Sequence, residues 1–495
     1  MRKPNQDAVI WWLELVLKLG MLTVGFLQAS SLTFGRPIIS VVLWPTLFLG
    51  GMLMLYRLWR WKQYAFSANL WLLALFCVSY VLSSLANIQY GWYANLRTWI
   101  WMVFLMFLLY GYRREEGRNQ YRIVAYFYIL GGAVLTLASF YFLLAGYEQT
   151  FFVESGPVYY IGFKWGRLYG AYWDPNIGAL LCCVSVLLSL GLMGKGRPVW
   201  LRLLLWVNIV LEILYIAFSD SRAGHLCLCV GMSVYVLLYL WPRRKKWLAV
   251  LGAIVMAAAM WFAVEGIQQA YNQMMIRENI THDQEIPDVF EESGKDAIWE
   301  EGPPQETVPP PVEALPPEEE LIGREEDYNQ DISNRRFDIW KSALEIFKEK
   351  PVLGIGHENV LAYVEQNMPD SYLITNDHMK FSSMHNIFFD ILVGQGAVGV
   401  ILFVVTGILF AVRIIRRWPT IRSKEARDGS SMYIAMFTIL VILVTAGCVM
   451  TEIIYVSSPM STMFWISLSQ LVQKGNGKEA ESQRGENTER VGGGV

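Results

Sequence analysis

Apolar runs of about twenty residues recur along most of the chain, separated by polar loops. A run of this length lets an α-helix cross the roughly 30 Å hydrocarbon core of a membrane. The pattern predicts an all-α polytopic integral membrane protein with about 12 transmembrane helices. The predicted spans are 8–28, 37–56, 66–86, 93–112, 122–145, 176–193, 200–218, 223–241, 246–265, 386–412, 432–451 and 457–473.

One polar loop, residues 266–385, is far longer than the others. Its first part, 266–282, is expected to continue the ninth helix. The next part, 283–327, is acidic and rich in proline, and such a segment predicts a disordered insertion because it cannot bury enough apolar surface to fold. Residues 333–350 predict an amphipathic helix on the outer membrane face or over the bundle. Its apolar residues at helical spacing are Phe337, Trp340, Leu344 and Phe347.

Lysine and arginine gather in every second loop and at both ends of the chain. The positive-inside rule then places both termini in the cytoplasm and the long loop outside, between spans nine and ten. The predicted parts are 1–150 with N-terminal helices, 151–265 with helices and arginine-bearing outer loops, 266–385 with the extracytoplasmic loop, 386–473 with C-terminal helices, and 474–495 as a disordered cytoplasmic tail.

Composition adds few constraints beyond the membrane. Only 17% of residues are charged, below the roughly 25% of soluble domains. The six cysteines all lie in apolar runs, and no zinc pattern or D-x-D acid pair is present, so we expect no metal and no cofactor. No nucleic-acid partner is expected. Glu14 and Lys18 stand one turn apart inside the first span and are expected to pair.

The outer loops carry few arginines, so each one is informative. Arg167 precedes span six, Arg222 joins spans seven and eight, and Arg335 and Arg336 begin the amphipathic helix. Guanidinium groups bind phosphate oxygens in a two-pronged geometry. A charge at the membrane edge normally has a partner, and a lipid diphosphate would be one. The alternatives are an ion pair with Asp220, an interface anchor at Arg167 and a solvated helix face at Arg335 and Arg336.

A histidine stands where the long loop returns to the membrane. His385 is followed by Asn386 and, five residues on, by Asp390. Histidine is a natural general base near neutral pH, and Asp390 is close enough in the sequence to orient its ring. The alternatives are a hydrogen-bonded interfacial histidine and a buried acid bonded to a hydroxyl or to the backbone. His357 and His378 are expected on the surface.

At these residues the chain resembles the O-antigen ligase and O-antigen polymerase superfamily of bacterial membrane glycosyltransferases. The resemblance covers roughly residues 160–412 and rests on an ordered series. The series is Arg167-Leu168-Tyr169-Gly170, Pro175-Asn176, Ser221-Arg222-Ala223-Gly224, Arg336, Trp340, Pro351, Gly354-Ile355-Gly356, His385-Asn386, Gly396 and Gly399. The chain departs from the family at Gly394, where relatives often carry an acid, and in its acidic insertion.

The resemblance implies a metal-independent, inverting transfer at the outer face of the bacterial cytoplasmic membrane, in cell-surface polysaccharide biosynthesis. The partners implied are an undecaprenyl-diphosphate-linked glycan donor, a glycan acceptor and the lipid bilayer. Arg222 would be catalytic and hold the diphosphate with Arg335 or Arg336, and His385 would take or orient the acceptor proton. Arg167, Asn386 and Asp390 would help to bind substrate.

Several functions remain open on the sequence. The enzyme would be a polymerase, a ligase or a protein O-oligosaccharyltransferase, since the acceptor is not encoded in any motif. A polysaccharide flippase or other transporter is the non-enzymatic alternative, and a sensor or scaffold is a third. A transporter would be expected to place charges at the midplane of several spans and to show repeat halves. Here the polar candidates gather at one face.

The loop alternation predicts the topology. A reporter enzyme that is active only outside the cytoplasm should be active when fused near Gly323, and a reporter active only inside should work near Arg244. Activity assays of the two fusions in whole cells measure this. The reverse pattern would contradict the orientation and the position of the candidate site.

Overall fold

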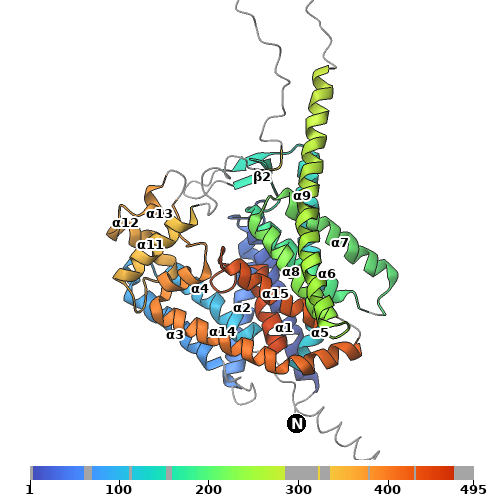
Figure 1. The fold of residues 1–495 in the computed structure, drawn as a ribbon. Coiled ribbons are helices and arrows are strands. Elements are labelled where there is room, and N and C mark those ends of the chain that lie inside the picture. Colours follow the sequence, from blue (N-terminus) through green and yellow to red (C-terminus); the bar gives the residue numbers. More distant parts are fainter. Residues whose placement is uncertain are drawn as a thin grey trace, which may run out of the picture.

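The computed structural model describes most of the chain. The described residues are 4–60, 70–110, 114–151, 159–194, 196–284, 321–323, 335–376, 380–428 and 431–472. They form a bundle of helices with a separate helical unit at one side (Figure 1). The predicted cytoplasmic tail, His378 and most of the acidic insertion lie outside the described residues.

Eight of the described helices are long and apolar enough to cross a membrane. They are α1 (Pro4–Ala29), α2 (Ile38–Trp59), α5 (Arg114–Leu144), α6 (Pro175–Leu192), α7 (Val199–Phe218), α8 (Arg222–Leu240), α9 (Lys246–Gln284) and α14 (Ile387–Asp428). Shorter apolar helices are α3 (Leu70–Ala86), α4 (Tyr93–Val103) with its continuation η2 (Phe104–Leu109), and α15 (Met432–Gly447). A helix therefore lies at eleven predicted spans, and α16 (Pro459–Val472) lies at the twelfth, so the number of helices that actually cross stays a prediction.

The prediction of an all-α protein is wrong in one segment. A three-stranded antiparallel sheet of β1 (Gln149–Phe151), β2 (Tyr159–Lys164) and β3 (Arg167–Gly170) lies in the connection between α5 and α6. The segment is rich in tyrosine and phenylalanine, which favour strands, and a two-residue turn joins β2 to β3. Strands this short give no signal when apolar runs of membrane-spanning length are sought.

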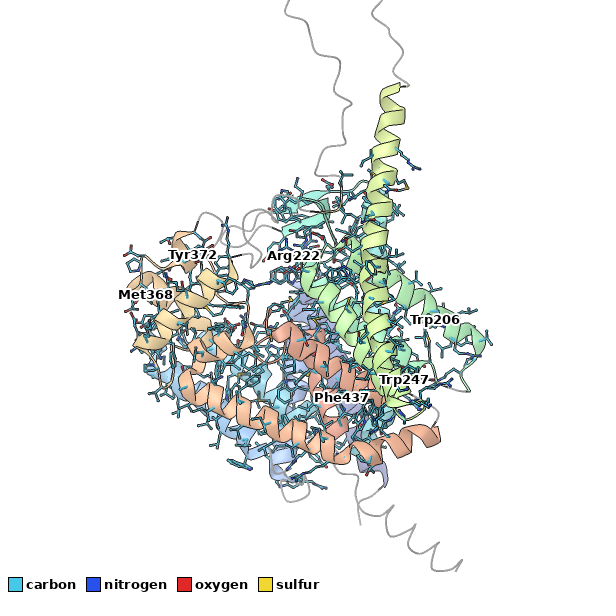
Figure 2. All side chains as sticks on the ribbon, viewed as in Figure 1. Trp206, Arg222, Trp247, Met368, Tyr372 and Phe437 are labelled. Carbon is cyan, nitrogen blue, oxygen red and sulfur yellow. The ribbon has the colours of Figure 1, made fainter. Side chains whose placement is uncertain are left out.

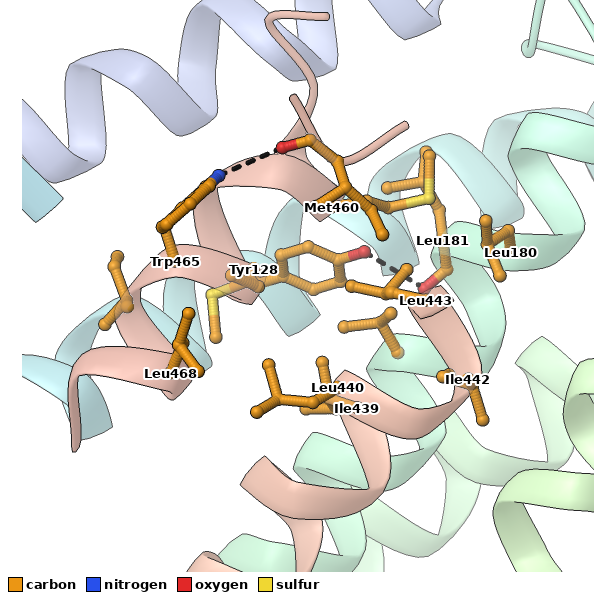
Figure 3. Close-up of a cluster of buried hydrophobic side chains, with 14 of the residues drawn as sticks. Tyr128, Leu180, Leu181, Ile439, Leu440, Ile442, Leu443, Met460, Trp465 and Leu468 are labelled. Atoms are coloured by element: carbon orange, nitrogen blue, oxygen red, sulfur yellow. Dashed lines mark hydrogen bonds between the residues drawn. The ribbon is translucent and has the colours of Figure 1, made fainter. Parts of the chain in front are cut away.

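The core of the bundle lies where α5, α6, α15 and α16 meet (Figure 3). Tyr128 is fully buried there, and its hydroxyl donates a hydrogen bond of 3.3 Å to the Leu181 carbonyl. The indole of Trp465 donates to the Ile453 carbonyl at 3.0 Å. Large aromatic side chains thus fill the core while their polar atoms keep hydrogen-bond partners.

The expected pair of Glu14 and Lys18 does not form. The Arg57 guanidinium of α2 donates to Glu14 at 2.6 Å, and the Lys18 ammonium donates to the Gln120 side chain at 2.5 Å. All these groups are buried, so a partner on another helix satisfies each charge better than a neighbour one turn away. The pairs connect α1 to α2 and α5.

The helical unit at the side of the bundle has a core of its own. It contains α11 (Arg336–Glu349), η4 (His357–Asn359), α12 (Val360–Asn367) and α13 (Tyr372–Thr375). The predicted amphipathic helix contains α11, but its predicted apolar face is only partly correct. Phe337 and Leu344 are 67% and 45% exposed, whereas Ile339, Ala343 and Ile346 are buried. The predicted set and the buried set both have helical spacing. The set that contains Ile339, Ala343 and Ile346 is buried because α11 packs on α13 and α14.

Residues 321–323, inside the predicted disordered insertion, are ordered, which corrects the boundary of that segment. The Ile322 side chain is 5% exposed, and its backbone N–H and C=O both bond the Asn272 amide at 2.8 Å. The Gly323 N–H donates to the Gly166 carbonyl at 3.2 Å. This short segment therefore joins α9 to the turn between β2 and β3.

Helix α14 is broken near its start by one residue with a non-helical backbone conformation. Gly396 has φ 63° and ψ −160°, and a side chain there would collide with the Val352 carbonyl. The break lets Ala397 N–H donate to the Pro351 carbonyl at 2.8 Å and Ile355 N–H donate to the Val393 carbonyl at 2.9 Å. Backbone pairing thus fixes the helical unit to α14, and with it the position of α11.

Candidate functional site

Five segments that are distant in the sequence converge at one end of the bundle. They are the β3–α6 connection, the α7–α8 corner, the start of α11, the approach to α14 and the loop 448–458 between α15 and α16. Arg222 marks this place in Figure 2, at the end of α8 that faces the helical unit. Electrostatic interactions link charged groups of all five segments, as described below.

Arg167 is a structural clamp in this arrangement. It is buried, its Nε donates to the Ser219 carbonyl at 2.9 Å, and its Nη2 donates to Asn176 Oδ1 at 2.9 Å. The Ser221 hydroxyl donates to the same Asn176 oxygen at 2.9 Å. The guanidinium therefore holds the corner between α7 and α8 against the start of α6. Its predicted part in substrate binding stays a prediction.

Arg222 is the first residue of α8 and is exposed. Ser221 caps the helix by accepting a hydrogen bond of 3.1 Å from Gly224 N–H. Arg336 is the first residue of α11 and is half-buried. Burial lowers the pKa of Arg336 below its usual value, the like charge of Arg222 lowers it further, and Asp174 opposes both. Two guanidinium groups from separate segments thus stand near one another, an arrangement that an anion between them would stabilise.

Arg335 precedes this pair in an unusual conformation. Its φ of 64° and ψ of 8° are left-handed, and it stands at the N-cap position of α11 without a side-chain capping bond. A left-handed backbone turns the chain sharply before the helix begins. The helix then begins at Arg336, whose charge interacts with that of Arg222.

His385 is exposed and also has a left-handed backbone, with φ 48°. Protein atoms crowd around the ring although part of it meets solvent, and this loss of water contact lowers the pKa of His385 below its usual value. Asp390 opposes the shift, Arg336 adds to it, and Asp174 opposes it. The imidazole thus remains neutral, and able to accept a proton, at lower pH than usual.

Asp390 and Asn386 form the frame that carries this histidine. The buried Asp390 carboxylate accepts hydrogen bonds from Met384 N–H at 2.8 Å, from the Ser383 hydroxyl at 3.1 Å and from the Thr451 hydroxyl. Asn386 Oδ1 caps α14 by accepting from Phe388 N–H at 2.9 Å. Asp390 thus accepts from the backbone and from hydroxyl groups around His385, so the acid orients the chain segment more directly than the ring.

Asn386 also ties this segment to the loop 448–458. Its side-chain amide donates to the Cys448 carbonyl at 2.8 Å. Further along the same loop the Tyr455 ring stacks on His357, with centroids 4.1 Å apart, and its hydroxyl accepts from Gln395 at 2.5 Å. His357 is therefore half-buried and packed, and the prediction of a surface histidine is wrong. Contacts at both ends fix the loop over the site.

Two acids that the sequence reading did not select lie in the site. Asp174 caps α6 by accepting from Asn176 N–H at 2.7 Å and interacts electrostatically with Arg336, His385 and Glu452. Asp174 could have been identified from the sequence, because it directly precedes Pro175-Asn176 in the series that carries the family resemblance. Glu452 stands in the short loop between α15 and α16, which contains no recognisable sequence motif.

Glu452 is only 7% exposed, and its Oε2 has no hydrogen-bond partner among the described residues. Burial raises the pKa of Glu452 to about 8, the Ser458 hydroxyl opposes this, and the charge of Asp174 adds to it. The carboxyl group is therefore mostly protonated at neutral pH and is available as a hydrogen-bond donor.

Gly394 sits where a side chain has little room. A Cβ atom there would lie 3.2 Å from the Cβ of His357, and the Ser83 hydroxyl donates to the Gly394 carbonyl at 2.7 Å. The close approach of η4 therefore leaves little room for a longer side chain at this position. In the described residues, no three His, Cys, Asp or Glu side chains are grouped as metal ligands.

The fold and site together define a polytopic membrane protein with cationic and proton-accepting groups gathered at one end of its bundle. Residues 207–404 match the family model described as O-antigen ligase. This match covers less than half of the chain and supports its resemblance to the O-antigen ligase and polymerase superfamily. The match runs from α7 into α14 and includes Arg222, Arg336 and His385. No curated protein matches the chain.

The raised pKa of Glu452 predicts a pH-dependent stability. The folded protein holds this proton up to about pH 8, whereas the ordinary value is 4.5, so the stability contributed by protonation is lost as pH rises between these values. Glu452→Gln keeps the shape and cannot ionise. We therefore expect the melting temperature of the wild type to fall, relative to Glu452→Gln, between pH 4.5 and about pH 8, and to level off above that. Thermal unfolding of both purified proteins across this range measures the difference, and parallel curves would contradict it.

Proposed function

We propose that the protein is a membrane glycosyltransferase that moves an undecaprenyl-diphosphate-linked glycan onto an acceptor hydroxyl at the outer face of the cytoplasmic membrane. The observation that carries the proposal is the convergence of Arg222, Arg336 and His385 at one end of the bundle. The family match supports a glycosyltransferase of the O-antigen ligase type. Polymerase and ligase differ in their acceptor, which this chemistry leaves open.

The donor already carries its leaving group. The acceptor oxygen forms a bond to the anomeric carbon while the bond from that carbon to the diphosphate oxygen breaks, and undecaprenyl diphosphate leaves with the electron pair. Negative charge therefore grows on the diphosphate in the transition state. Arg222 and Arg336 are placed to stabilise that charge, and an attack opposite the leaving group inverts the anomeric configuration.

The acceptor hydroxyl loses its proton during this step. His385 is partly exposed, is held by the Asp390 frame and stays neutral below the usual pH range of histidine, so its ring nitrogen can take the proton. Glu452, protonated at neutral pH, can donate a hydrogen bond to a sugar oxygen. A bound metal has no necessary part in this scheme, because the two arginines supply the positive charge.

A transporter is the main alternative. Its charges would be expected along a path through the bundle, and no chemistry would require a proton acceptor at the outer end. The region instead combines two guanidinium groups, an imidazole whose pKa is lowered and a carboxyl group that is mostly protonated at neutral pH. This combination is more useful for group transfer than for transport.

Arg222→Lys keeps the positive charge but loses the planar fork that binds two phosphate oxygens. We expect a loss of transfer of at least about tenfold, with normal expression, and a larger loss in Arg222→Ala. Arg243→Lys on the loop between α8 and α9 is a matched control, since the Arg243 guanidinium bonds the Tyr239 carbonyl and lies over the Tyr239 ring. Near-normal turnover of Arg222→Ala would contradict the proposed role of Arg222 in binding the diphosphate.

His385→Ala should nearly abolish transfer, because a positioned general base contributes on the order of 10²- to 10⁴-fold to rate. The measurement uses purified protein, lipid-linked glycan and EDTA, with turnover expressed per correctly folded molecule. Wild-type kcat/KM should fall on the acid side only below about pH 6.5, since the pKa of His385 is lowered. Inhibition of the wild type by EDTA would show a required metal, and wild-type turnover in His385→Ala would contradict the catalytic role.

A further inference from the structure

An exposed tryptophan stands at the tip of the hairpin between β2 and β3. Trp165 and Gly166 form the two-residue connection, and both have positive φ, at 50° and 65°. A type I′ turn requires this conformation and favours Asn-Gly in these two positions. A bulky residue in the first position is an outlier, and such outliers often mark functional positions. Trp165 is 46% exposed, so burial in the core does not explain it.

A second irregularity lies in the same hairpin. Gly162 pairs with Gly170 and Phe163 pairs with Leu168, so Tyr169 is an extra residue in β3. A β-bulge of this kind turns a side chain in a new direction, and bulges are frequent beside active sites. The hairpin thus contains two local departures from regular structure, and both involve an aromatic residue.

The two departures bring three aromatic rings together. The Tyr160 ring centroid lies 4.5 Å from that of Trp165 and 5.4 Å from that of Tyr169, and the last two are 6.4 Å apart. Tyr160 and Tyr169 are half-buried. We call these three residues the aromatic platform.

The platform is continuous with the diphosphate side of the site. Tyr169 follows Arg167 by two residues, and Arg167 bonds the Ser219 carbonyl in the segment that leads to Arg222. The Tyr169 carbonyl accepts from the Tyr215 hydroxyl of α7 at 3.2 Å. Sugars attached to a diphosphate at Arg222 would therefore extend over the outer surface on which the hairpin stands (Figure 1).

We propose that Tyr160, Trp165 and Tyr169 stack against sugar rings of the donor glycan, beyond the sugar that is joined to the diphosphate. Aromatic faces carry partial negative charge and attract the C–H groups on the face of a pyranose ring. This inference rests on the proposed function, since it needs a lipid-linked glycan as substrate. The competing explanation is an aromatic belt that anchors the protein at the membrane interface.

Binding of two lipids separates these explanations. The probes are undecaprenyl diphosphate without sugar and the native lipid-linked glycan extracted from cells that lack this enzyme, each titrated against the full-length protein in nanodiscs. Trp165→Asn should weaken binding of the glycan-bearing lipid on the order of tenfold and leave binding of undecaprenyl diphosphate unchanged. Because Asn-Gly suits the turn, its melting temperature should not fall. Trp165→Phe should retain most of the affinity.

Trp92→Asn is the matched control, since Trp92 is an exposed tryptophan of a predicted outer loop and packs on Tyr93 away from the platform. It should leave both affinities unchanged. Unchanged affinity of Trp165→Asn for the glycan-bearing lipid, or an equal loss for both lipids, would overturn the proposal. A wild-type protein that bound neither lipid would instead contradict the proposed function itself.

Discussion

The candidate site depends on the hydrogen bonds that the buried Asp390 carboxylate accepts. This carboxylate lies one turn inside α14 and accepts hydrogen bonds from Ser383, Met384 and Thr451, which belong to two separate segments. A buried carboxylate without such partners would be costly, so the surrounding chain must keep its donors in place. The same bonds fix the left-handed backbone of His385 and the loop that carries Glu452. One acid thus determines where a base and a second acid stand.

The helical unit reaches the site because α14 is not continuous. The left-handed Gly396 opens the helix, and the freed backbone pairs with residues 351–356, as strands pair. That pairing holds α11 beside α14, with the Trp340 ring stacked on Phe389 at 5.3 Å. Arg336 at the start of α11 consequently meets Arg222 from α8, although 113 residues of sequence lie between them. Backbone hydrogen bonding therefore creates the cationic part of the site.

The ionisable groups of the site differ in their exposure to solvent, and this difference sets which of them are charged at neutral pH. Arg222 and His385 remain exposed, whereas Glu452 is buried. Water still reaches the groups that would meet a charged substrate, while burial keeps Glu452 protonated near neutral pH. Asp174 interacts with groups of both kinds and moderates their charge. Group transfer uses such a combination, since it requires a fixed cation, a proton acceptor and a proton donor at neutral pH.

The sequence by itself determined the membrane class, the helix at each apolar run, and the residue types able to bind a diphosphate and accept a proton. These features follow from local chemistry, since about twenty apolar residues must form a helix in hydrocarbon and histidine titrates near neutral pH. The tertiary structure decided the rest. It assigned Arg167 to the clamp, paired Glu14 with Arg57, selected the buried stripe of α11, formed the hairpin that holds Trp165 and brought in Asp174 and Glu452. Each of these outcomes depends on which distant segment supplies a partner for a buried polar or apolar group, and that information is not contained in the spacing of residues along one segment.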